Sequence, residues 1–258
     1  MKLAGFHLRS LYTACAFLLL LAGFAGADEW ARFRGPNGSG VSPAKTVPAR
    51  WEESDFNWKI DLPGEGNSSP VIWKERVFVT AADNSAAKRS LLCIDESSGK
   101  TLWKRDFPYA TYRKHKNNSY ASNTPAVDGE RVYTLWQSKA GSSLVALDHG
   151  GKESWRYDLG PYLHGQGGGT SPIVFEDLVI VANDHKTNSF LLALERKTGK
   201  EKWKIPRKGK RACYSTPCVF SAPGRPTEII FVHCFEGIVG VDPVRGRQNW
   251  MIDVFGTF

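Results

Sequence analysis

The sequence lacks the residue spacings of common metal and redox sites. It contains five cysteines and six histidines, but no Cys-x-x-Cys motif and no pair of histidines at ligand spacing, so we expect no metal site. No segment shows a sustained 3.6-residue apolar period, which excludes stacked helical repeats. The longest apolar run, at positions 11–24 apart from Tyr12 and Thr13, has about 14 residues and falls short of the ~20 needed to cross a bilayer.

The first 27 residues have the pattern of a cleaved export signal. Lys2 and Arg9 precede the apolar run, and Ala25-Gly26-Ala27 offers small residues for cleavage before Asp28. We therefore assign residues 1–27 to a signal peptide and predict a periplasmic or secreted protein of the bacterial cell envelope. After cleavage we expect no integral membrane span.

Positive charge exceeds negative charge along the chain, with a formal net charge of +8. Lysines and arginines are scattered, with small clusters only at 113–116 and 207–211. A basic exported protein can meet anionic lipid or polysaccharide, but solvated loops are the simpler interpretation of such scattered charge. Export also argues against a nucleic-acid partner.

Four cysteines follow the signal segment: Cys93, Cys213, Cys218 and Cys234. An oxidising compartment permits disulfides. Pro217 restricts the path between Cys213 and Cys218, and Cys93 and Cys234 lie in expected strands, where cysteine is often a small buried apolar residue. We expect no obligatory disulfide.

A tryptophan-centred pattern recurs along most of the chain, which is the most informative feature of the sequence. The tryptophans are separated by 45, 52, 48 and 47 positions, and each of the last four follows a Gly-Lys or Gly-Arg pair by four residues from the glycine. The tryptophans are Trp58, Trp103, Trp155, Trp203 and Trp250, and the glycines are Gly99, Gly151, Gly199 and Gly246.

Each repeat also contains the signals of short strands. An apolar run that ends on an acidic residue precedes each glycine, at 91–95, 144–148, 191–195 and 238–242, and reads as a buried strand followed by a tight hairpin turn. Each repeat opens with Ser-Pro or Thr-Pro, at 69–70, 124–125, 171–172 and 216–217, before a β-branched run. Proline is tolerated at the first position of a strand.

Four short strands per repeat of this length predict the blade of a β-propeller. The predicted fold is therefore all-β, with about four four-stranded antiparallel blades at 68–107, 122–159, 169–206 and 214–254. A sandwich would not need the same glycine-to-tryptophan offset four times. Residues 28–55 form an N-terminal leader, and 56–62 is expected to be the latch strand of a final blade.

These residues resemble the repeat of pyrroloquinoline-quinone (PQQ)-type propellers, with the pattern clearest at 191–203. That superfamily includes quinoprotein alcohol dehydrogenases and the propeller subunit of the outer-membrane β-barrel assembly machinery. The resemblance covers 58–258, and the segment 30–40 looks like the leader of secreted bacterial members. It implies that each tryptophan packs over the next blade beside the glycine turn.

The family closes its ring with more blades than this chain supplies, since eight blades would need roughly 380 residues. We expect a partial ring, and two explanations remain open. The chain is a truncated form of a longer protein, which we favour, or two half-rings associate.

The loops that lead into each first strand are polar and alike from blade to blade. They would ring the propeller axis, and loops of this kind carry function. The candidate ligand-facing residues are Asn67, Ser68, Asn123, Thr170, Tyr214 and Ser215. The loop 109–120, which mixes tyrosine with lysine and arginine, is a second candidate interaction surface.

Two functions fit the resemblance. The favoured one is a non-catalytic scaffold that binds a protein or a polysaccharide in the cell envelope. The alternative is a PQQ-dependent dehydrogenase, or a fragment of one, which would need the quinone, a bound calcium and an aspartate base. No adjacent cysteine pair of the catalytic members occurs, and no catalytic, cofactor or metal residue can be assigned.

Two further motifs have simple interpretations. The glycine-rich segment 164–169 precedes an expected strand, whereas a phosphate cradle needs a helix N-terminus, so we interpret it as an interblade loop. Asp184-His185 has no Ser or Cys partner in the sequence and is expected to be a solvated turn.

Overall fold

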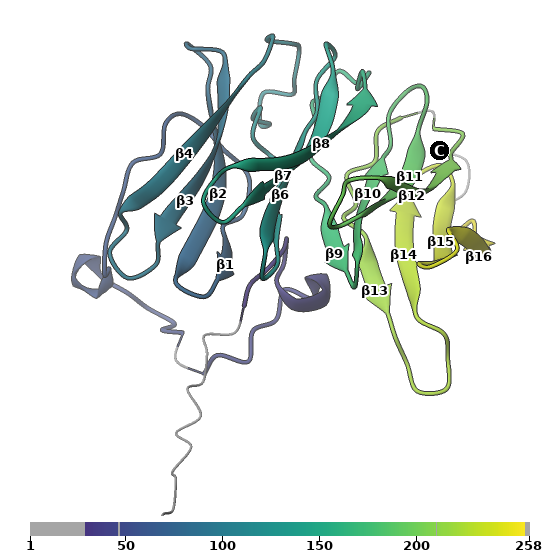
Figure 1. Ribbon diagram of the computed structural model, residues 1–258, viewed down its shortest axis with the longest axis horizontal. Coiled ribbons are helices and arrows are strands. Elements are labelled where there is room, and N and C mark those ends of the chain that lie inside the picture. The colour runs from purple at the N-terminus through teal and green to yellow at the C-terminus, as the bar shows by residue number, and fades with distance from the viewer. Residues whose placement is uncertain (1–28, 46, 210, 256–258) are drawn as a thin grey trace, which may run out of the picture.

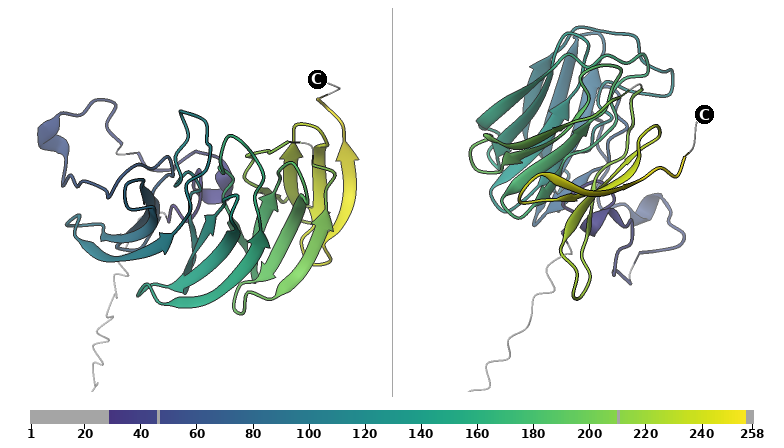
Figure 2. Two further views of the ribbon diagram at one scale, coloured as in Figure 1. Left: turned by 90° about the horizontal axis from the view of Figure 1, so that it is seen from above. Right: turned by 90° about the vertical axis from the view of Figure 1, so that its right-hand side faces the viewer.

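The computed structural model describes residues 29–45, 47–209 and 211–255, which form four separate four-stranded antiparallel sheets. The prediction of an all-β propeller with about four blades is confirmed (Figure 1). Seen from above, the blades stand side by side in an arc that follows the chain (Figure 2). The signal peptide assigned to residues 1–27 lies outside the described residues.

The strands of each blade follow one another in the sequence and in the sheet. Blade 1 contains β1 (Val71–Trp73), β2 (Arg76–Asp83), β3 (Lys88–Asp95) and β4 (Thr101–Pro108). Blade 2 contains β5 (Ala126–Val127), β6 (Arg131–Trp136), β7 (Ser142–Asp148) and β8 (Glu153–Gly160). Blade 3 contains β9 (Ile173–Phe175), β10 (Leu178–Asn183), β11 (Phe190–Glu195) and β12 (Glu201–Pro206). Blade 4 contains β13 (Cys218–Phe220), β14 (Glu228–His233), β15 (Gly237–Asp242) and β16 (Arg247–Ile252). Two 3-10 turns, η1 (Pro36–Gly38) and η2 (Glu53–Asp55), precede the blades.

The central strands of each blade are buried on both faces, which explains their continuous apolar runs. In β10 all six residues are buried, whereas β12 at the outer edge alternates exposed and covered side chains. In each blade the third strand shifts register against the fourth at the equivalent point. The shift lies between Cys93 and Ile94 in blade 1 and between Ala193 and Leu194 in blade 3. A bulge increases local twist, so the four blades twist alike at their outer edges.

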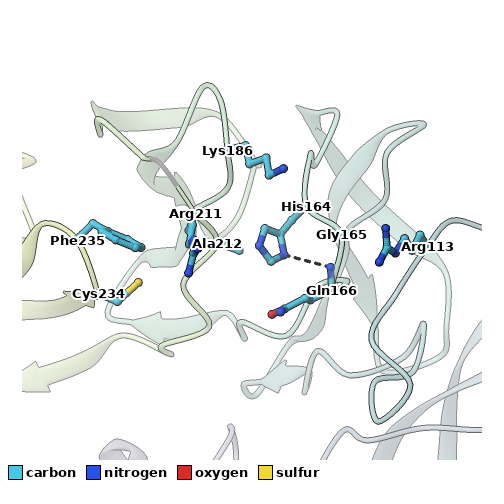
Figure 3. A pocket seen from close by; sticks show the side chains of 9 residues that line it. All are labelled: Arg113, His164, Gly165, Gln166, Lys186, Arg211, Ala212, Cys234 and Phe235. Carbon is cyan, nitrogen blue, oxygen red and sulfur yellow. Dashed lines mark hydrogen bonds between the residues drawn. The ribbon is translucent and has the colours of Figure 1, made fainter. Parts of the chain in front are cut away.

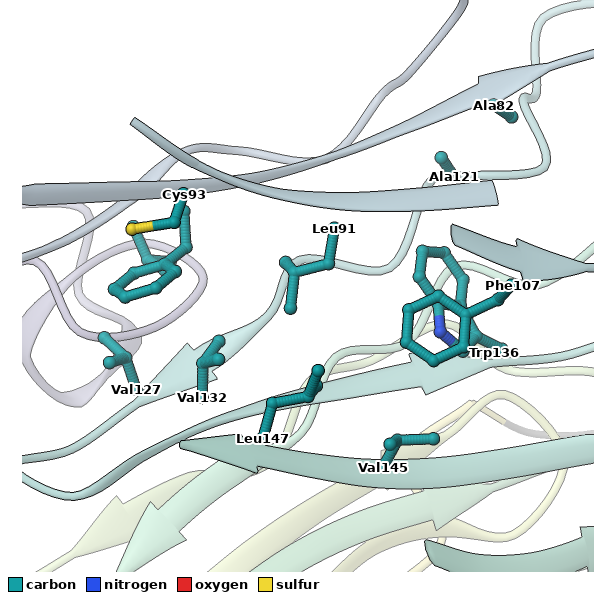
Figure 4. Close-up of a cluster of buried hydrophobic side chains, with 12 residues drawn as sticks. Ala82, Leu91, Cys93, Phe107, Ala121, Val127, Val132, Trp136, Val145 and Leu147 are labelled. Carbon is teal, nitrogen blue, oxygen red and sulfur yellow. The ribbon is translucent and has the colours of Figure 1, made fainter. Parts of the chain in front are cut away.

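The hydrophobic core lies between neighbouring blades and has no single centre. In the first interface, Leu91 and Phe107 of blade 1 face Val132 and Leu147 of blade 2 (Figure 4). Equivalent clusters join blade 2 to blade 3 and blade 3 to blade 4. Each blade is therefore stabilised by the blades beside it.

The repeated tryptophans cross these interfaces as expected. The indole N–H of Trp155 donates a 3.0 Å hydrogen bond to the Arg196 carbonyl in the following blade. The ring lies on Gly199, whose φ of +71° belongs to the left-handed region. The same contact joins Trp58 to Gly99, Trp103 to Gly151 and Trp203 to Gly246.

Trp250 departs from this pattern. Its indole N–H donates to the Glu228 carboxylate of its own blade at 2.9 Å, and its ring lies on Gly240 of the same blade. Within the described residues no further glycine turn stands beside it. The fifth tryptophan of the pattern therefore packs inside its own blade.

The expected latch segment, 56–62, forms no strand in the described structure. It packs on the face of blade 1 that is turned away from blade 2. Trp58 and Ile60 pack against a cluster that includes Val79 and Leu92, and the Trp58 indole donates to the Glu96 carbonyl at 2.7 Å. The segment takes the place that the tryptophan strand of a preceding blade would occupy.

The leader follows the inner strands. The carbonyl of Trp30 accepts from Ile72 N in blade 1, and the Ala31 carbonyl accepts from Val127 N in blade 2. Buried Arg32 donates to the Pro217 carbonyl at 2.6 Å, and the Asn37 side chain makes two hydrogen bonds to the Val219 backbone in blade 4. The leader thus contacts the first, second and fourth blades.

We expect Gly199→Ala to destabilise the protein more than Gly224→Ala. The two glycines have φ of +71° and +72°, but only at Gly199 would an added Cβ approach an indole, at 2.6 Å from Trp155 Cδ2. The left-handed conformation costs an alanine roughly 1–2 kcal/mol at either position. Displacing the indole adds about 1–3 kcal/mol at Gly199 alone. Urea unfolding of both variants measures the difference, and equal losses would contradict the proposed role of the tryptophan contact.

Candidate binding site

The long interblade loops and one set of hairpin turns emerge at the same end of the blades. The loops are residues 109–125, 161–172 and 207–217, and the turns follow β2, β6, β10 and β14. An antiparallel four-stranded blade places them there because its second turn and its exit lie on the same side. We call this side the loop end.

The Ser-Pro and Thr-Pro positions of the repeat join one blade to the next. Ser69 N donates to Thr124 Oγ1 at 2.9 Å, and Thr124 N donates to Ser171 Oγ at 3.0 Å. Each hydroxyl thus accepts a hydrogen bond from the equivalent backbone position of the preceding blade. This contact accounts for the small hydroxyl residue at the start of blades 2 and 3.

The candidate ligand-facing residues fall into two groups. Asn123 and Thr170 are buried, with Asn123 Nδ2 donating to the Thr170 carbonyl at 2.5 Å and Thr170 Oγ1 to the Ser215 carbonyl at 3.0 Å. Asn67 is exposed, and Ser68 and Ser215 are half-buried. Tyr214 is 36% exposed and lines a small hollow at the loop end.

The loop 109–120 turns its tyrosines inward. The rings of Tyr109 and Tyr112 pack against Tyr120, with centroids 4.8 and 4.9 Å apart. The Tyr112 hydroxyl donates to the Gln137 carbonyl at 2.9 Å. This packing leaves Arg113 at the surface, where it lines the hollow described next.

A hollow of about 610 Å³ lies among the loops of blades 2, 3 and 4 (Figure 3). Its cationic side chains come from three different segments: Arg113, Lys186 and Arg211. None of the three forms an ion pair with another described residue, and no described Asp or Glu lines the hollow. Three positive charges around one opening repel one another, and a bound anion would relieve that repulsion.

Two smaller hollows, each of about 260 Å³, continue this opening. One shares Arg113 and Lys186 with it and adds Lys139. The other shares Gln166 and is lined by His115, Asn117 and Tyr214. We call the three together the loop-end groove.

Aromatic rings accompany the cations in the loop-end groove. The Arg211 guanidinium lies 5.6 Å from the centre of the Phe235 ring. The Tyr214 hydroxyl is 2.9 Å from His164 Nδ1, with the two rings edge to face. Burial, followed by the positive charges of Lys186 and Arg211, lowers the pKa of His164. The positive charge of the groove therefore comes from its arginines and lysines.

The turn at Asp184-His185 is not solvated, so that expectation was wrong. Both residues are 1% exposed, because Arg207 and Tyr162 cover them. Arg207 Nε lies 3.4 Å from Asp184 Oδ1, and the Tyr162 ring lies 5.2 Å from the His185 ring, tilted by 43°. Arg207 also pairs with Glu236 at 3.3 Å. The Arg207 side chain is 3% exposed, so the interpretation of 207–211 as solvated is wrong at Arg207, whereas Lys208 and Arg211 are exposed.

The acidic groups beneath the groove do not neutralise its cations. Burial raises the pKa of Asp184 to about 7, since desolvation outweighs the attraction of Arg207 and Glu236 adds a further negative neighbour. Glu236 faces Arg207. The charge of Arg113, Lys186 and Arg211 is therefore left for solvent or for a ligand.

Sequence reasoning recognised Arg113, Arg211 and His164 separately but did not bring them together. Lys186 and Phe235 went unnoticed because each stands alone in a short hairpin turn. The sequence did contain a signal that could have grouped these residues, namely their positions relative to the predicted strands. All of these residues fall in loops or turns at the same end of the predicted blades.

The residues of the groove do not fit a calcium-bound quinone. Calcium prefers several oxygen ligands, mainly carboxylates, whereas the hollow has no described carboxylate. Across the described ranges no group of three or more His, Cys, Asp or Glu side chains is placed to hold a metal ion. Within the described residues, the free thiols are those of Cys93, Cys213, Cys218 and Cys234.

The part of the chain covered by the structure has no helix with the length and apolar character that a membrane crossing requires.

A family model described as outer membrane protein assembly factor BamB matches residues 87–257, well over half of the chain. The chain belongs to this family. The match begins in blade 1 and includes blades 2 to 4 with the whole loop-end groove. Curated proteins provided no match to the sequence.

Two solved structures are similar in fold to this chain. Quinohemoprotein alcohol dehydrogenase from Comamonas testosteroni matches with a TM-score of 0.62 and 16% identity, over 90% of this chain and 42% of that one. The enzyme ADHIIG from Pseudomonas putida HK5 matches with a TM-score of 0.56 and 16% identity, over 73% of this chain and 34% of that one. The chain thus spans less than half the length of either enzyme, and the likeness shows a shared propeller fold.

The raised pKa of Asp184 predicts a pH dependence of stability. A carboxyl with a native pKa of about 7 binds its proton more tightly in the folded chain than in the unfolded chain, where the value is 3.8. The stability that the protonated carboxyl adds to the folded chain is complete below about pH 4 and is lost as the pH rises towards 7. Thermal unfolding should therefore show Asp184→Asn gaining stability relative to the parent between pH 4.5 and 7.5. The exposed Asp61→Asn is the control, and a parent-to-variant difference at Asp184 that stays constant with pH would contradict this assignment.

Proposed function

We propose that the chain is an exported β-propeller scaffold that holds a protein or polymeric ligand of the cell envelope at its loop end, without catalysing a reaction on it. The observation that carries this proposal is the loop-end groove, in which Arg113, Lys186 and Arg211 surround one opening without an acidic partner among the described residues. The export pattern of residues 1–27 and the family description, an outer membrane assembly factor, support a location in the envelope.

The groups in the groove are suited to anchoring. Tyr214 has a pKa raised to about 12 by burial, with the Cys213 and Cys234 thiols adding to the shift, so its hydroxyl is a donor and a poor base. Burial also raises the pKa of Cys234, and the neighbouring Cys213 reinforces that shift. A thiol with a raised pKa is a poor nucleophile at neutral pH. Guanidinium and ammonium groups remain as strong contacts for an anion.

The alternative is a quinoprotein-like oxidoreductase, or part of one, and the two dehydrogenase structures motivate it. The cations of the groove would accept the carboxylates of PQQ, but nothing in the described lining would hold calcium beside it. Titration with PQQ and calcium separates the two functions. We expect no saturable change in thermal unfolding and no reduction of an artificial electron acceptor. A saturable change with acceptor reduction would replace the scaffold proposal by the enzyme.

Binding to the cell envelope should depend on the groove. We expect purified protein to sediment with isolated envelopes, and the double variant Lys186→Glu/Arg211→Glu to bind at least about tenfold more weakly, which corresponds to ~1.4 kcal/mol. Raising the salt concentration should also weaken envelope binding of the parent protein, because salt screens exposed charges.

The control for this experiment is Lys197→Glu/Lys202→Glu, which makes the same charge change on exposed residues at the opposite end of blade 3. Equal losses in both double variants would mean that net charge, and not the loop-end groove, governs envelope binding.

A further inference from the structure

We propose that the loop-end groove binds an acidic polysaccharide, a polymer of sugar rings that carry carboxylates. This inference rests on the proposed function, since it names the ligand class of the same groove. It combines three observations: the unpaired cations, the flat rings beside them, and two wall carbonyls that already accept hydrogen bonds.

The first observation is the distribution of charge. Arg113 belongs to the loop before blade 2, Lys186 to a turn of blade 3 and Arg211 to the loop before blade 4. Lys139 continues the series into the adjoining hollow. Cations supplied by successive blades suit a ligand that repeats its negative charge along its length. Arginine also binds a carboxylate with two parallel hydrogen bonds.

The second observation is the presence of aromatic surface. Phe235 is half-buried beside Arg211, and Tyr214 is 36% exposed beside His164. Flat rings of this kind bury apolar area against another flat surface. A sugar ring has a C–H face that can lie on them while its carboxylate reaches the guanidinium. An acidic peptide has no such face on its charged residues.

The third observation concerns the backbone of the groove walls. The Gln166 carbonyl accepts from His115 N at 3.2 Å and from Asn118 Nδ2 at 2.7 Å. The Gly168 carbonyl accepts from the same amide at 3.0 Å. Peptides often bind by adding a strand to an open sheet edge, whereas these two carbonyls already accept hydrogen bonds within the loops. The side chains of Asn117 and Gln166 line the groove and supply amide partners for sugar hydroxyls.

The test measures binding of the protein without its signal segment to four probes: an oligomer of galacturonic acid, the same oligomer with its carboxylates methyl-esterified, poly-glutamate, and single-stranded DNA. We expect the galacturonate oligomer to bind tightest, with at least tenfold weaker binding after esterification. Lys186→Glu/Arg211→Glu should lose this binding, whereas Lys197→Glu/Lys202→Glu should keep it.

A second variant tests whether an aromatic ring contributes to sugar binding independently of charge. Phe235→Leu retains an apolar side chain but removes the flat ring. We expect it to weaken galacturonate binding several-fold and to leave the weak binding of poly-glutamate unchanged. Circular dichroism and thermal unfolding of each variant confirm that the blades are intact before binding is compared.

The other outcomes overturn the inference in distinguishable ways. Tighter binding of poly-glutamate points to an acidic protein segment, and tighter binding of DNA points to nucleic acid. Loss of envelope binding in the groove variant without any galacturonate binding rejects the polysaccharide and retains the scaffold. Envelope binding that is unaffected by the groove variant, together with no binding of any probe, rejects both.

Discussion

The contact between four of the five repeat tryptophans and the glycine turn of the following blade sets the geometry on which the rest of the structure depends. The indole of Trp203 illustrates it: the ring lies on Gly246, and its N–H donates to the Pro243 carbonyl at 2.7 Å. A side chain at the glycine would lift the ring, and another residue in place of tryptophan would lose either the area or the donor. This contact fixes the angle between blades, and with it the distance between the loops that form the groove.

The fold could be predicted because it repeats. The offset from Gly199 to Trp203 recurs in four copies, and a repeat that cannot bury its own faces must stack on its neighbours. The leader could not be predicted in the same way. Its contacts to Pro217 and Val219 join positions 185 and 182 residues apart, and no local pattern encodes such a pairing.

The groove was less accessible to sequence reasoning because its residues lie outside the repeat. Lys186 and Arg211 are 25 positions apart in the sequence, and only the return of β12 towards the loop end brings them to one opening. The expectation that Asp184 is solvated was wrong for a different reason. Its turn looked polar and therefore exposed, but Arg207 from the next loop pairs with it and removes it from water. The polar character of these residues was therefore not a guide to their exposure.

The leader has a consequence for the order in which the chain can assemble. Blades interact with their sequence neighbours, so their interfaces can form one after another as the chain emerges. Arg32 and Asn37 must wait until β13 of blade 4 and the residue before it exist, because their partners are Pro217 and Val219. Contacts between such distant positions form slowly, since a long loop must close first. The N-terminal leader can therefore complete its contacts only after the chain has reached the start of the fourth blade.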